Sequence, residues 1–131
     1  MFRAIVLVFI GGAVGAVIRE LLMLQIPDGR DGFPWSIFVA NVVASFVLGL
    51  VNGLHSRGAL GSDANLLVGT GVTGGMSTFS SFAYATFVLW TTSEIGASVG
   101  IVYALASLAV GLAAVLLGLK VGGSGPKKEA A

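Results

Sequence analysis

The stretch GTGVTGGMSTFSSF, residues 69–82, decides which fold we predict. It contains four glycines and six Ser or Thr residues, yet it lies inside one of the most apolar parts of the chain. Two interpretations are open: a flexible loop between buried helices, or one helix interrupted where a polar group must be held. The rest of the sequence has to distinguish them.

The composition is that of a membrane protein. Of the 131 residues, 56% are hydrophobic and only 10% are charged, whereas about a quarter are charged in a typical soluble domain. The mean hydropathy is +0.98. The chain has no cysteine, which excludes disulfides and thiolate chemistry. A net charge of +1 gives no reason to expect a nucleic-acid partner. We therefore expect the lipid bilayer to surround this chain.

Four stretches are long enough to cross a bilayer as helices, which takes about 20 mainly apolar residues. They predict an all-α transmembrane domain over residues 1–121, followed by a polar, disordered tail over 122–131; the expected spans are about 4–24, 35–54, 66–90 and 95–119. The N-terminal apolar run also resembles a secretory signal, but it continues through Leu24, so a first transmembrane helix is the better interpretation.

Charge and glycine spacing suggest how the spans assemble. An even number of spans puts both termini on one side, and without the tail the Lys and Arg count is three on that side against two on the other. So weak a bias permits insertion in both orientations.

Small residues four apart let helices approach closely in lipid. Each span has such a glycine pair, which predicts a compact bundle that oligomerises: Gly11/Gly15, Gly49/Gly53, Gly71/Gly75 and Gly96/Gly100.

Polar residues inside the spans cost free energy in the hydrocarbon region, so each one is a candidate for a structural or functional role. Arg19 and Glu20 lie near the end of the first span, where they either snorkel to the interface or serve the function. Asn41 is either a contact between helices or a neutral amide donor for an anion. Tyr103 and Ser107 share a helix face, and they either bond to neighbouring helices or line a wet path.

In residues 69–82 the pair Gly74-Gly75 disfavours a helix, and Ser77-Thr78 favours the start of a new one. A break there would expose carbonyl groups, which suit a cation, and N–H groups, which suit an anion.

Phe79 and Phe82 follow on one face. Such rings usually pack in a core or against lipid, but their positive edges can also face a small anion. The single histidine, His55, has no carboxylate cluster beside it, and the chain lacks catalytic motifs, so we do not expect an enzyme.

These motifs together resemble the CrcB/Fluc fluoride channel family over nearly the whole chain. The resemblance rests on GGAVGAVIR (residues 11–19), Asn41, GGMSTFSSF (residues 74–82), Tyr103 and Ser107. Two departures from the usual family pattern are the serines at positions 77 and 81, where threonine is common. Glu20 is another, and it could neutralise the charge of Arg19.

The resemblance implies a dual-topology homodimer of antiparallel subunits, each with four transmembrane helices, the third broken near its centre. It implies two fluoride pores in the cell inner membrane and a structural Na⁺ at the dimer interface, bound through the backbone carbonyls of Gly74 and Ser77. The side chains that it places along the fluoride path are Arg19, Asn41, Thr78, Phe79, Ser80, Ser81, Phe82, Tyr103 and Ser107.

The function that the resemblance implies is passive export of cytoplasmic fluoride. Two alternatives stay open at this point. One is a small dual-topology exchanger of drugs and protons, for which Glu20 is the only carboxylate within the spans. The other is a subunit that is silent without an unlike partner.

Overall fold

The structure is a computed structural model that describes residues 1–29, 32–91 and 96–125. All regular secondary structure in the described ranges is helical, without a strand. Its helices are α1 (Phe2–Gln25), α2 (Trp35–Ser56), α3 (Ser62–Ala64), the π-helix η1 (Asn65–Val72), α4 (Thr73–Met76), α5 (Phe79–Thr91) and α6 (Gly96–Gly123).

Three of the helices are long and apolar enough to span a membrane: Phe2–Gln25, Trp35–Ser56 and Ala97–Gly123. They correspond to the predicted first, second and fourth spans. The segment predicted as the third span, 66–90, is instead divided among η1, α4 and α5, none of which is long enough alone. Helix α6 continues to Gly123, so the first two residues of the predicted tail are helical, and residues 126–131 lie outside the described chain.

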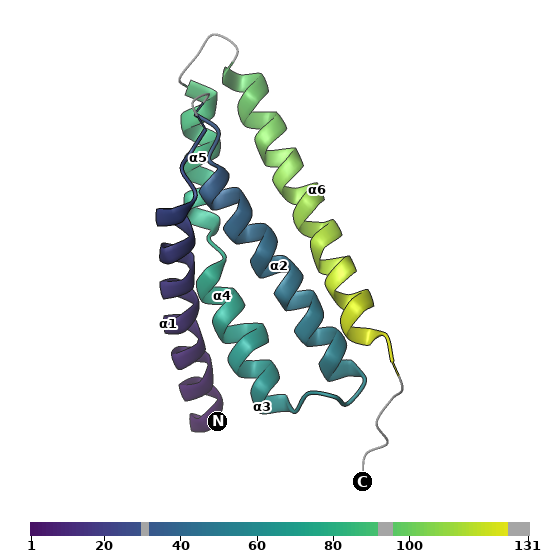
Figure 1. The fold of residues 1–131 in the computed structure, drawn as a ribbon. Coiled ribbons are helices and arrows are strands. Elements are labelled where there is room, and N and C mark those ends of the chain that lie inside the picture. Colours follow the sequence, from purple (N-terminus) through teal and green to yellow (C-terminus); the bar gives the residue numbers. More distant parts are fainter. Residues whose placement is uncertain (30–31, 92–95, 126–131) are drawn as a thin grey trace.

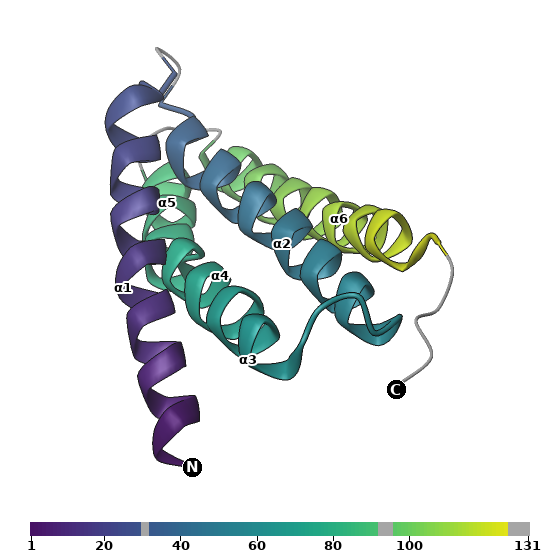
Figure 2. The ribbon, with the colours of Figure 1, turned by 60° about the horizontal axis from the view of Figure 1, so that its bottom comes forward.

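The helices run side by side in one bundle (Figure 1). Helix α1 packs against η1 and α4, while α2 lies between that group and α6, and α5 packs against α6. Figure 2 shows the same neighbours from another side, with α2 and α6 running together.

The start of α1 and the end of α6 lie at the same end of the bundle, as Figure 1 shows. At this end Arg3 forms an ion pair with Asp63 of α3. Arg57, just after α2, donates from Nη1 to the carbonyl of Ser124 at 3.0 Å. These contacts agree with an even number of passes through the bundle.

Glycine contacts bring the helix backbones together. A Cβ atom on Gly11 would collide with the Leu67 carbonyl and lie 2.9 Å from Gly71 Cα, and one on Gly49 would lie 2.9 Å from Leu119 N. A Cβ on Gly100 would lie 3.0 Å from the Thr86 carbonyl. The glycine pairs of the first three predicted spans therefore mark close helix contacts, and so does Gly100 in the fourth, because a side chain would crowd the neighbouring backbone.

Much of the outer surface is apolar. Large hydrophobic side chains such as Phe9, Leu105 and Leu108 are well over half exposed, and the small buried cluster consists of Ile37, Ala85, Leu89 and Tyr103. Contiguous apolar surface of this extent suits lipid contact and not water.

Candidate ion site at the broken helix

The helix break predicted within residues 69–82 is present at Ser77 and Thr78. Helix α4 ends at Met76, and Ser77 has extended backbone angles (φ −75°, ψ 151°). Helix α5 then begins at Phe79. The Thr78 hydroxyl accepts a bond from the backbone N–H of Ser81 at 3.2 Å. Thr78 is therefore the N-cap of α5, the role that the sequence predicts for a hydroxyl here.

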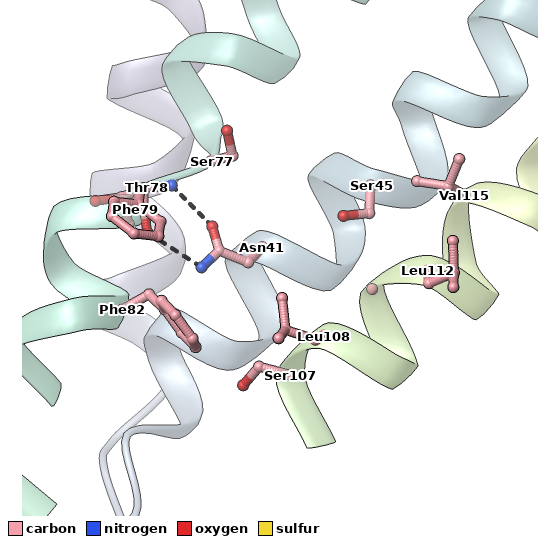
Figure 3. Close-up of a pocket in the computed structure, with 11 residues that line it drawn as sticks. Asn41, Ser45, Ser77, Thr78, Phe79, Phe82, Ser107, Leu108, Leu112 and Val115 are labelled. Atoms are coloured by element: carbon pink, nitrogen blue, oxygen red, sulfur yellow. Dashed lines mark hydrogen bonds between the residues drawn. The ribbon is translucent and has the colours of Figure 1, made fainter. Parts of the chain in front are cut away.

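Asn41 of α2 binds the backbone of the break on both of its hydrogen-bonding sides (Figure 3). The Thr78 N–H donates to Asn41 Oδ1 at 2.8 Å, and Asn41 Nδ2 donates to the Thr78 carbonyl at 3.3 Å. The side-chain amide thus supplies a donor and an acceptor to backbone that leaves the helical pattern at membrane depth. The second hydrogen of Asn41 Nδ2 is not used in these two bonds.

Arg19 of α1 binds the other side of the break. Its Nη1 donates to the carbonyl of Gly75, near the end of α4, at 3.1 Å. A cation is favourable beside helix carbonyls that have lost their intrahelical donors. Of the roles open to Arg19, the structure therefore favours anchoring the helix. Glu20 is exposed and makes no ion pair within the described ranges.

A cavity of about 380 Å³ lies at the break, between α2, α5 and α6. Figure 3 shows its side chains, with Asn41 directed at Thr78 and Phe82 beside them. Five of the predicted path residues line it: Asn41, Thr78, Phe79, Phe82 and Ser107. Ser45, Ser77 and a wall from α6 complete the lining, which contains no charged side chain.

Three aromatic rings form a row from α5 to α6. The centroids of Phe79 and Phe82 are 5.9 Å apart, and those of Phe82 and Tyr103 are 5.6 Å apart. Phe79 is 81% exposed, whereas Tyr103 is fully buried. The Tyr103 hydroxyl and Ser107 Oγ are buried without a hydrogen-bond partner in the described part of the chain. Buried polar atoms of this kind usually have a partner, and here a bound ion or water could supply it.

The other predicted path residues do not line this cavity. Ser80 and Ser81 bond with the Thr78 hydroxyl, Tyr103 packs behind Phe82, and Arg19 faces the end of α4. Ser45 also lines the cavity. Its spacing of four from Asn41 predicts that both lie on one helix face, but Ser45 is not among the residues predicted for the fluoride path.

The residues proposed for sodium suit that ion. The carbonyl of Gly74 lacks its usual helical donor, because the Thr78 N–H four residues later bonds to Asn41. Gly74 and Ser77 are both exposed, and neutral backbone oxygens at an unwound helix are common Na⁺ ligands. Among the described residues there is no cluster of three acidic, His or Cys side chains that could hold a metal otherwise.

Comparison with known proteins assigns the chain to a family. The model of the family described as "CrcB-like protein, Camphor Resistance (CrcB)" matches residues 6–119. The chain belongs to the CrcB family. This match includes the broken segment and all the residues that line the cavity.

Similar CrcB-family proteins are named as ion channels. The chain is 48% identical over 122 residues to "Fluoride-specific ion channel FluC 1" of Brucella abortus, covering 93% of this chain and 45% of that protein. It is 46% identical over 130 residues to "Fluoride-specific ion channel FluC 3" of Yersinia pseudotuberculosis, covering 98% of this chain and 93% of that protein. The chain therefore spans less than half of the Brucella relative and nearly all of the Yersinia one.

Proposed function

We propose that this chain is the subunit of a fluoride-selective channel that lets cytoplasmic fluoride leave passively across the cell inner membrane. One observation carries the proposal: an uncharged cavity at the helix break, where an amide, hydroxyls and two phenylalanine rings converge. The names of the CrcB-family relatives agree with it. The chemistry is that of a selectivity filter and not of an enzyme, because no bond is made or broken.

The lining suits a small, strongly hydrated anion. Water can leave fluoride only if other hydrogen-bond donors replace it, and Asn41 and Ser107 can provide them. The positive edges of Phe79 and Phe82 add a weaker attraction. Since no Lys or Arg lines the cavity, the anion is not held so strongly that it cannot leave.

The partner that we propose is a second copy of this chain, antiparallel to the first. An exposed stripe of polar or small residues runs along η1, α4, the break and the start of α5. It consists of Thr70, Gly74, Ser77 and Ser80. Such a stripe is unfavourable against lipid and favourable in a helix contact. The small Lys and Arg imbalance supports an arrangement in which the two copies insert in opposite orientations.

Sodium belongs to the same proposal as a structural ion. When bound, it would supply a fixed positive charge at the subunit interface. The carbonyls of Gly74 and Ser77 would hold it, and the extended backbone at Ser77 frees them from the helix.

The test is anion efflux from liposomes that contain only this purified chain, measured with a fluoride electrode and then with a chloride electrode. We expect rapid loss of fluoride and little loss of chloride. Phe79→Ile and Phe82→Ile should each reduce fluoride loss strongly, and a variant with the parental rate would remove that ring from the mechanism. Equal loss of both anions would overturn selectivity.

Two outcomes would favour the alternatives. Absence of flux from folded dimers would point to a subunit that needs an unlike partner. Proton exchange driven by a cationic drug would favour the exchanger, although Glu20 is exposed on α1 and does not line the cavity at the break.

A further inference from the structure

The ring of Tyr103 on α6 is fully buried and is in contact with two other rings. The centroid of Phe82 lies 5.6 Å away, with the two ring planes tilted by 33°. Phe33 meets the Tyr103 ring edge to face, with centroids 5.4 Å apart and an angle of 84° between the planes. Both distances are those of favourable aromatic pairs. Phe82 lines the cavity at the break, whereas Phe33 does not.

Phe33 lies just before α2, which starts at the end of the bundle away from both termini (Figure 1). Its carbonyl accepts bonds from the N–H groups of Gly29 at 3.0 Å and Trp35 at 2.9 Å. Its ring also pairs with Trp35, at 4.3 Å between centroids, and with Phe38, at 5.9 Å. Backbone and side chain of Phe33 are therefore both held in place.

The chain before Phe33 is also bonded to α2, through Asp28. The hydroxyl of Ser36 donates to Asp28 Oδ1 at 2.9 Å, and the Ser36 N–H donates to the same oxygen at 3.5 Å. Ser36 is the buried second residue of α2, so the carboxylate lies at the helix N-terminus, where a negative charge is favourable. These bonds connect the chain ahead of Phe33 to the helix that follows it.

The hydroxyl of Tyr103 has no such bond. Like Ser107 Oγ, it is buried without a hydrogen-bond partner in the described part of the chain. Packing around the ring, and not a hydrogen bond to the protein, therefore has to fix the position of this hydroxyl. That position matters for an ion, because a hydrogen bond weakens steeply as its angle departs from linearity.

We infer that Phe33 is a positioning residue for the fluoride path: its contact with the Tyr103 ring holds the Tyr103 hydroxyl where it can donate to the ion. This inference rests on the proposed function. Phe33 itself does not line the cavity at the break, so it acts through Tyr103. The consequence is that a residue at one end of the bundle influences the flux of fluoride near its middle.

Fluoride flux into and out of liposomes gives the first test. Phe33→Leu keeps an apolar side chain but removes the ring edge, and we expect it to lower fluoride flux by about two- to tenfold, as loss of one aromatic pair would. Phe33→Tyr keeps the ring and should keep the parental rate. The control is Phe38→Leu, because Phe38 pairs with the rings of Phe33 and Trp35 and not with that of Tyr103 among the described residues. Equal loss in Phe33→Leu and Phe38→Leu would overturn the inference.

A double-mutant cycle tests whether Phe33 acts through the hydroxyl. Tyr103→Phe keeps the ring that Phe33 contacts and removes only the hydroxyl, and it should itself lower fluoride flux. Added to Tyr103→Phe, the change Phe33→Leu should cause no further loss, because the group that it positions is already absent. A purely structural role of Phe33 would leave its effect unchanged in this background, and two losses that simply multiply would overturn the inference.

The chemical shift of the Tyr103 Cζ carbon reports on its hydroxyl without any flux. The chain has two tyrosines, and Tyr84 is 70% exposed, so a protein labelled with ¹³Cζ-tyrosine in detergent gives two resonances that Tyr84→Phe assigns. We expect added fluoride, and not chloride, to shift the Tyr103 resonance in the parent and to shift it less in Phe33→Leu. If fluoride leaves this resonance unchanged in the parent, or shifts it equally in both proteins, the inference is wrong.

The flip rate of the Tyr103 ring separates this inference from the proposed function. A parent protein without fluoride flux would contradict the channel proposal. In that case faster flipping of the Tyr103 ring in Phe33→Leu than in the parent or in Phe38→Leu would still support Phe33 as the residue that holds Tyr103. Equal flip rates in the three proteins would overturn that role, whether or not the chain conducts.

Discussion

Helix α6 and the segment from η1 to α5 satisfy the hydrogen bonds of their backbone groups in opposite ways. In α6 the backbone is helical from Gly96 to Gly123, so the N–H and carbonyl groups inside the helix bond to one another. In the broken segment, backbone at Thr78 and Gly75 is instead bonded by side chains of α2 and α1. The conformation of α6 is therefore local, whereas that of the broken segment depends on two other helices.

Replacing Asn41 should destabilise the broken segment more than any other change considered below. Asn41→Leu leaves both the N–H and the carbonyl of Thr78 without the bonds seen here, and we expect a loss of about 2–6 kcal/mol in unfolding free energy, with loss of fluoride flux. Thermal unfolding in detergent measures the first effect. The control is Asn52→Leu in the same helix, because Asn52 bonds only to Leu48 one turn away. If both variants lose equal stability, Asn41 does not hold the break.

Arg19→Met should have the next largest effect. It removes a charge-assisted bond to the Gly75 carbonyl and should destabilise the fold by about 1.5–3 kcal/mol. Arg19→Lys should recover part of this loss, since an ammonium group can also donate to a carbonyl. Glu20→Met changes an exposed neighbour on the same helix and should be neutral in the same unfolding measurement. Parental stability in Arg19→Met would show that α4 does not need this anchor.

The glycine contacts allow a test on the continuous helices. A Cβ on Gly15 of α1 would collide with the Val72 carbonyl and lie 2.9 Å from Met76 N. Gly15→Ala should therefore cost about 1–3 kcal/mol through overpacking. Gly12→Ala places a Cβ at 4.0 Å from the nearest atom and should be tolerated. Equal unfolding temperatures for the two variants would contradict the close contact between α1 and η1.

The smallest effect should come from the cap of α5. Thr78→Val keeps the shape of the side chain but removes the acceptor for the Ser81 N–H, with an expected cost of about 1 kcal/mol. Thr91→Val makes the same change in the last turn of α5, where the hydroxyl bonds to the Phe87 carbonyl, and should have less effect. A larger loss for Thr91→Val would place the main stabilisation of α5 at its other end.

Features that depend on local sequence could be predicted. Apolar length identified the continuous helices, glycine spacing identified close helix contacts, and the Gly-Gly and Ser-Thr pairs located the break. The structure shows that Thr78 is the member of the Ser-Thr pair that caps α5. The four-span, two-orientation assembly stays a prediction.

The contacts that hold the break could not be predicted in the same way. Asn41 and Thr78 are 37 residues apart, and Arg19 and Gly75 are 56 apart, so only the packing of α1 and α2 brings them together. The π-helical register of η1 also has no signal in the sequence pattern, since π-helices are rare and depend on local context. Residue types therefore indicated that these side chains matter, while the fold decided what they bind.

The exposed stripe of Thr70, Gly74, Ser77 and Ser80 has a consequence for biogenesis. In a newly inserted single copy this surface faces lipid acyl chains, which offer its hydroxyls no hydrogen-bond partner. In the dimer that we propose, the lone subunit is an assembly intermediate, and its lifetime is governed by how many copies share the membrane. At low expression, surveillance proteases of the bilayer would encounter more unpaired subunits, so the yield of finished channel should rise more steeply than the rate of synthesis.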